Sequence, residues 1–142
     1  MHHATVTVTP HGTFAANAVN FQLDGLNDGE TGEDWDEATI THNNAPAVTG
    51  VNTLDVAKTT AVAGSFTLYD DHIDEGYIAS SSALLDFIKA DTDGRVTFIL
   101  RYASDQGNKT AWIYSKEGGD YDLAPKLSFL YLRAAGTLLT VH

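Results

Sequence analysis

Short stretches in which apolar and polar residues alternate recur along this sequence. In residues 4–9, Val6 and Val8 alternate with threonine, and residues 18–23 and 64–69 repeat the pattern with larger side chains. A period of two places successive side chains on opposite faces of a β-strand. We therefore predict strands with one face in a core, and we expect Val6 and Val8 to share that face.

The same alternation marks the second half of the chain. Residues 95–103 form the strongest predicted strand, and residues 126–132 form another whose two faces we expect to be partly buried. An Asp-Gln-Gly-Asn turn sequence separates residues 95–103 from residues 110–115, so we expect these two stretches to pair as a hairpin. Brief strands are predicted at residues 53–56 and 77–78.

One helical pattern interrupts the strands, at residues 83–90, where leucine and isoleucine recur at helical spacing. Ser81 or Ser82 can cap its first turn, and Gly94 can close its end. A helix of this length is not stable alone in water. We therefore expect it to pack against the strands as a plug of the core.

Many short strands with one helix, and no strand–helix–strand rhythm, are typical of one fold class. The sequence predicts an all-β fold, an antiparallel jelly-roll-like β-sandwich with one short helix. Its 142 residues suit a single domain. We assign residues 1–132 to that domain and residues 133–142 to a linker and a C-terminal strand.

Charge and composition exclude several function classes. The chain has 19 acidic and 8 basic residues, a net charge of −11, which disfavours binding to nucleic acid or to anionic membranes. It has no cysteine, so disulfides and thiolate metal sites are excluded. No apolar run is long enough to cross a bilayer, so we expect no membrane insertion.

Carboxylates gather in the segment 24–34, which we predict to be a surface loop, and just after it. The candidate oxygen ligands for calcium are Asp28, Glu30, Glu33, Asp34 and Asp36. A second acidic group consists of Asp70, Asp71, Asp74 and Glu75. Neither group has the spacing of an EF-hand loop. We predict no cofactor and no metal site, and we leave open a structural calcium ion in one of these loops.

Residues 35–46 contain an unusual mixture of one tryptophan with small, polar and turn-forming residues. We predict a short strand that buries the Trp35 indole, followed by a turn at Asn43, Asn44 and Pro46.

This segment has the pattern W-x-E-x-x-I-T-x-N-N-A-P, with GLNDG before it at 25–29 and SKE and APKLSFLYL after it within 115–132. The three motifs resemble DNRLRE-type β-sandwich modules of secreted bacterial and archaeal proteins, over about residues 5–132. Some such modules bind carbohydrate within polysaccharide-degrading enzymes, and others are spacers or surface-protein domains. The resemblance implies an extracellular or cell-surface location, and it implies N-terminal strands that this chain lacks.

The end of the chain carries a strand-like segment beyond the family pattern. Residues 137–141 are apolar, rich in β-forming residues and uncharged. We expect this segment either to complete the sheet of a neighbouring copy by strand donation or to fold back beside residues 4–9. The candidate self-assembly residues are Leu138, Leu139, Val141, Val6 and Val8.

The leading hypothesis is therefore a non-catalytic, extracellular structural or adhesive subunit whose partners are copies of itself, joined head-to-tail into a fibre. His2 and His3 are terminal and the other four histidines are isolated, and the chain lacks both a nucleophile elbow and a phosphate-binding loop. The alternative is a carbohydrate-binding module, with glycans as partners. Its candidate residues are Trp112, Tyr114, Tyr102 and Asn108, although we expect core packing to be the role of Trp112.

Overall fold

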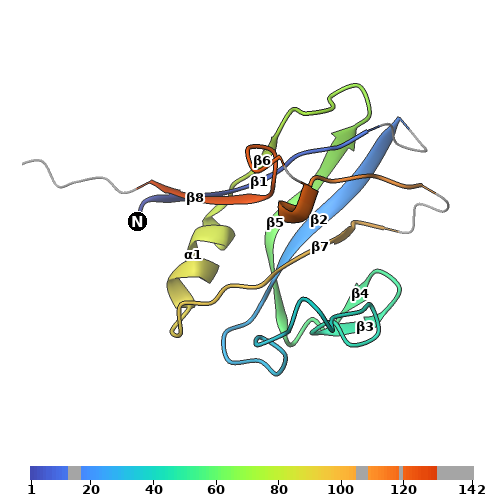
Figure 1. Cartoon of the computed structure of the whole chain (residues 1–142). Coiled ribbons are helices and arrows are strands. Elements are labelled where there is room, and N and C mark those ends of the chain that lie inside the picture. The colour runs from blue at the N-terminus through green and yellow to red at the C-terminus, as the bar shows by residue number, and fades with distance from the viewer. Residues whose placement is uncertain (13–16, 105–108, 119, 131–142) are drawn as a thin grey trace, which may run out of the picture.

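The computed structural model describes residues 1–12, 17–104, 109–118 and 120–130. This part of the chain consists mainly of antiparallel strands (Figure 1). The strands are β1 (His3–Val8), β2 (Ala18–Leu26), β3 (Val48–Gly50), β4 (Thr53–Leu54), β5 (Thr59–Tyr69), β6 (Tyr77–Ala79), β7 (Phe98–Tyr102) and β8 (Lys126–Leu130). The helices are α1 (Ser82–Ala90) and the 3-10 turn η1 (Lys116–Gly118). The predicted all-β, antiparallel class with one short α-helix is confirmed.

The longer strands form two three-stranded sheets, and β3 and β4 form a separate hairpin. In the first sheet, ordered β6-β1-β8, Val6 lies opposite Ala79 on one side and Leu127 on the other. In the second sheet, ordered β5-β2-β7, Phe21 lies opposite Tyr102 of β7. A complete jelly roll has eight strands in its two sheets. The jelly-roll connectivity therefore stays a prediction.

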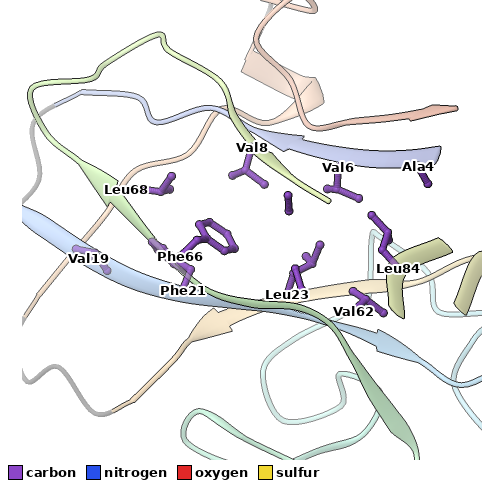
Figure 2. Close-up of a cluster of buried hydrophobic side chains, with 12 residues drawn as sticks. Ala4, Val6, Val8, Val19, Phe21, Leu23, Val62, Phe66, Leu68 and Leu84 are labelled. Atoms are coloured by element: carbon purple, nitrogen blue, oxygen red, sulfur yellow. The ribbon is translucent and has the colours of Figure 1, made fainter. Parts of the chain in front are cut away.

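The two sheets face each other across one hydrophobic core (Figure 2). Val6 and Val8 enter it from β1, and Phe21 and Leu23 enter it from β2, each with an exposed fraction of 6% or less. The alternation in the sequence therefore identified the inward faces correctly. Burial of each such side chain contributes about 1.5–3 kcal/mol, so this shared core holds the sheets together.

Helix α1 closes one end of the core. The Oγ of Ser81 accepts a 2.9 Å hydrogen bond from the backbone N–H of Leu84, which satisfies one of the free amides of the first turn. Leu84 is fully buried and points into the core near Val62 (Figure 2). The predicted cap and core plug are both confirmed.

Gly25 of β2 lies against the ring of Phe87 on α1, and we predict that this position admits no larger residue. A Cβ atom at Gly25 would overlap the ring, which also packs beside Phe98 with 5.8 Å between centroids. We expect Gly25→Ala to lower the free energy of unfolding by about 1–3 kcal/mol, because the ring or the helix must move. Urea denaturation followed by circular dichroism measures this change.

The matched control is Gly64→Ala on β5, where an added Cβ would meet no atom within 4 Å. We expect this variant to be no less stable than the parent, because alanine lowers the entropy of the unfolded chain. Equal losses in both variants would show that β-strand backbone, and not the Phe87 contact, determines the effect.

Residues 35–46 form turns, so the predicted strand is wrong. The Trp35 side chain is not buried either: the residue is 44% exposed, and its Nε1 donates a 3.2 Å hydrogen bond to Oγ1 of Thr97. The predicted turn is present, since the Asn44 side chain accepts from the Thr41 N–H and donates to the Thr39 carbonyl. Local side-chain bonds of this kind compete with strand pairing.

One boundary and one burial pattern also differ from the prediction. The loop predicted at residues 24–34 begins too early, because Asp24, Gly25 and Leu26 continue β2 and are buried. The expectation of two partly buried faces on β8 is wrong as well. Its outer face is exposed, with Leu130 at 53%.

The hairpin predicted between residues 95–103 and 110–115 does not form. The backbone N–H of Tyr114 donates to the Thr9 carbonyl at 3.1 Å, and Trp112 accepts at 2.8 Å from the N–H of His11. The stretch 110–115 therefore runs along the chain that follows β1. In the described part of the molecule, the edge of β7 that faces away from β2 has no partner strand.

Candidate functional site

The unpaired edge of β7 exposes backbone groups that can pair with another strand. The N–H of Ala103 donates to the Asn20 carbonyl, and the N–H of Leu26 donates to the Thr97 carbonyl, both at 3.0 Å. Hydrogen bonding alternates along an antiparallel strand. Between these two hydrogen bonds, every second residue of β7 therefore directs its N–H and C=O away from β2. Leu100 is one of these residues, and no backbone partner for it lies among the described residues. Such an edge is a template for strand addition.

A groove of about 360 Å³ follows this edge, and we call it the β7 groove. Its inner wall, which continues the core, consists of Leu100, Tyr102, Ala111 and Ile113. Its outer wall includes Ile99, Arg101, Val48 and Leu54, and the polar residues His42, Asn52 and Thr53 also line the groove. The outer wall therefore includes the β3–β4 hairpin, which lies beside β7 in Figure 1.

The register of β7 against β2 explains why its side chains divide between two walls. Leu100 lies opposite Leu23, and Tyr102 lies opposite Phe21, so both share the face of core residues. Ile99 alternates with them and points to the other face. A strand added at this edge would meet apolar side chains on both of its faces.

The one charged residue among the groove residues named above already has a partner. The Arg101 Nε donates a 2.7 Å hydrogen bond to Oδ2 of Asp24, whose side chain is only 5% exposed. Gln22 donates a second hydrogen bond to the same carboxylate, at 2.9 Å to Oδ1. The ion pair neutralises the guanidinium, so the groove favours an uncharged occupant.

The structure places the predicted self-assembly residues in different environments. Val6 and Val8 are 6% and 3% exposed, and β1 is paired on both of its edges by β6 and β8. Neither valine is presented to a second molecule, and both serve the core. Leu138, Leu139 and Val141 lie outside the described residues, as does the segment 133–142 assigned to the linker and strand.

The described members of the predicted sugar-binding set lie in different environments. Trp112 is 61% exposed, contrary to the expectation that core packing would claim it. Tyr114 lies beside His11 with 4.6 Å between ring centroids, and its hydroxyl donates a 2.8 Å hydrogen bond to Asp74, which raises the pKa of the tyrosine. Tyr102 instead lines the β7 groove and donates to the Lys109 carbonyl at 3.1 Å. Asn108 is outside the described residues.

The carboxylates that lie close together in the structure only partly match the predicted calcium ligands. Asp28 and Glu33 come together with Asp91 and Asp93, with one carboxylate oxygen of each within 4.8 Å of the others. Glu30 instead pairs with Lys58 at 3.8 Å. The remaining predicted ligands, Asp34 and Asp36 and the group at residues 70–75, form no such cluster in the described part of the chain.

This carboxylate cluster has the hard oxygen ligands that calcium prefers. The Oδ1 of Asp91 is buried there without a hydrogen-bond partner, while Oδ2 accepts a 2.9 Å bond from the N–H of Gly94. Asp91 and Asp93 were not among the predicted ligands because they follow α1, far along the chain from the loop of Asp28. The Asp-Thr-Asp-Gly run at residues 91–94 was the available signal.

The β7 groove was not predicted from the sequence. Residues 110–115 were expected to pair with β7, which would have closed the free edge. No role was assigned to Val48 or Leu54, whose short strands β3 and β4 gave only a weak alternation. A signal was present in Ile99, an apolar residue on the outward face of the strongest predicted strand.

In the described part of the chain, no helix has the length and apolar character needed to cross a bilayer. No protein-family model matches the sequence, and neither a curated protein nor a solved structure matches the chain.

Proposed function

We propose that this chain is a non-catalytic, extracellular structural or adhesive β-sandwich subunit that assembles head-to-tail into a fibre. In this proposal, each copy accepts a strand from its neighbour at the free edge of β7. The observation that carries the proposal is the combination of unpaired backbone at Leu100 with a groove that has apolar side chains on both of its walls. The resemblance to DNRLRE-type modules of secreted proteins supports the extracellular location.

A strand added at β7 would pair the free backbone groups of this edge and cover the apolar side chains of the groove. Main-chain hydrogen bonds from the incoming strand supply affinity, and the alternating side chains supply specificity. Donor and acceptor are different surfaces, so the contact is heterologous and propagates unless it closes on itself. An open filament of identical subunits is the expected product.

The test measures the mass and shape of the intact chain as its concentration rises. We expect light scattering to detect growing assemblies and negative-stain microscopy to show filaments. Each copy carries a net charge of −11, so screening of the repulsion by salt should promote assembly. Removal of residues 136–142 should abolish it, with circular dichroism confirming that the fold persists. A compact monomer at every concentration and salt level would refute the proposal.

A second candidate, carbohydrate binding, is favoured by the exposure of Trp112, because exposed indoles are typical stacking platforms. Retention on insoluble polysaccharide tests it. Retention that Trp112→Ala and Tyr114→Ala abolish, and that removal of residues 136–142 leaves intact, would favour this alternative.

A further inference from the structure

We propose that the strand bound by the β7 groove is residues 137–141 of a second copy, and that both faces of this strand contact the groove. Leu139 and Val141 lie against the inner wall, and Leu138 lies against the outer wall. The inference rests on the proposed strand addition at β7. It adds the face on which each donor side chain binds and a role for the β3–β4 hairpin as the second wall.

The two walls of the β7 groove restrict which strand can occupy it. A strand that extends the sheet at β7 alternates its side chains between the inner wall and the outer wall. Because Leu100 and Tyr102 line the inner wall and Ile99, Val48 and Leu54 line the outer wall, a strand with apolar residues on both faces covers more of this apolar lining than a strand with one polar face. The groove therefore favours a strand with apolar residues on both faces.

Residues 137–141 meet this requirement, and their sequence is Thr-Leu-Leu-Thr-Val. Leu139 and Val141 fall on one face of an extended strand, and Leu138 falls on the other with Thr140. The segment has no charge, which suits a groove in which Asp24 already neutralises the guanidinium of Arg101.

The two faces of β7 carry different side chains, and this difference indicates which face of the donor binds each wall of the groove. Its core face presents Phe98, Leu100 and Tyr102, and the two of these that line the groove are Leu100 and Tyr102. Leu139 and Val141 supply two successive apolar residues. The outer face of β7 presents one apolar residue, Ile99, and one charged residue. The donor face with one leucine and one threonine matches that composition.

The path of the chain favours a second copy over the same molecule. β8 ends at Leu130, which lies opposite His3 near the beginning of the chain. Figure 1 shows this end of β8 at the side of the molecule away from the β3–β4 hairpin and therefore away from the groove. Leu130 is the last described residue before the proposed donor, and its distance from the groove favours a groove on a neighbouring copy as the binding site.

The test uses the full chain with single substitutions in the donor and in the outer wall. We expect Leu139→Ser and Val141→Ser each to weaken assembly about 10- to 100-fold, because each removes one buried apolar side chain. Leu138→Ser should weaken it too, since the outer wall also binds the donor. Thr140→Ser is the matched control and should leave assembly unchanged. Sedimentation velocity over a concentration series gives the dissociation constants.

A mixing experiment identifies donor and acceptor directly. Val48→Lys places a charge in the outer wall and should disable the acceptor, with Leu54→Lys as the second choice if circular dichroism shows a damaged fold. A donor-defective Leu139→Ser chain mixed with an acceptor-defective Val48→Lys chain should form one-to-one complexes that do not grow. Chains that carry both substitutions should stay monomeric.

Three outcomes would overturn the inference, and they separate it from the proposed function. Filaments that are weakened by Val48→Lys but unaffected by the substitutions at residues 138–141 would retain strand addition and exclude this donor. Substitutions at residues 138–141 that lower the unfolding temperature of a monomer would show that the segment binds its own molecule. A full chain that never assembles would refute the proposed function itself.

Discussion

Replacement of Arg101 by methionine is expected to lower the free energy of unfolding by about 3–5 kcal/mol, because it leaves a buried carboxylate without its counter-ion. The Asp24 side chain is 5% exposed, and the Arg101 guanidinium reaches it at 2.7 Å. After the substitution, the amide of Gln22 is its one remaining side-chain donor among the described residues. Urea denaturation at neutral pH, followed by circular dichroism, measures the loss.

The control for this prediction removes both charges. Asp24→Asn combined with Arg101→Met should recover most of the lost stability, since a neutral amide costs far less to bury than an unpaired carboxylate. A loss below about 1 kcal/mol in the Arg101→Met variant alone would mean that water reaches the carboxylate and that the pair is only superficial.

The same ion pair connects the stability of the second sheet with the proposed assembly surface. Asp24 and Arg101 join β2 to β7, and β7 provides the free edge at which we expect a neighbour to bind. The pair therefore holds the acceptor strand in place while it neutralises the one charge on its outer wall. An apolar occupant meets no uncompensated charge there.

Local patterns in the sequence predicted those features of the fold that depend on a few neighbouring residues. The alternation in β1 and β2 correctly identified the inward faces of both central strands. Ser81 was recognisable as a helix cap from the apolar stripe that follows it. These features follow from strand pleating and from the free amides of a helix terminus, which are properties of the segment itself.

Pairing between distant segments was not predictable in the same way. The stretch 110–115 follows a turn sequence after β7, so a hairpin was the simplest expectation, yet it bonds to Thr9 and His11. A period of two shows that a segment is extended and does not show which strand lies beside it. The free edge of β7 is a direct consequence of this choice of neighbour.

The burial of a charged residue could not be predicted from the sequence either. Asp24 begins an acidic stretch that has the composition of a surface loop, and only the position of Arg101 on the adjacent strand explains its burial. Asp28 and Asp91 likewise meet only because α1 returns the chain to the loop after β2. The prediction for Trp35 was wrong in the opposite direction, since this large apolar residue was expected to be buried but is exposed and donates a hydrogen bond to Thr97.

Substitution of Leu84 by alanine is the second large effect that we expect, with a loss of about 2–5 kcal/mol in the free energy of unfolding. Leu84 is the fully buried residue of α1, and it fills the end of the core between the two sheets (Figure 2). Removal of three carbon atoms leaves a cavity, because the strands around it are held by their own hydrogen bonds and cannot collapse fully.

Leu85→Ala is the matched control for this substitution, because Leu85 has the same chemistry on the same helix but is only partly buried. We expect it to cost clearly less than Leu84→Ala in the same urea titration. Equal costs would indicate that the two leucines contribute similar apolar contacts and that Leu84 has no special role as a plug, because alanine is the better helix former at both positions.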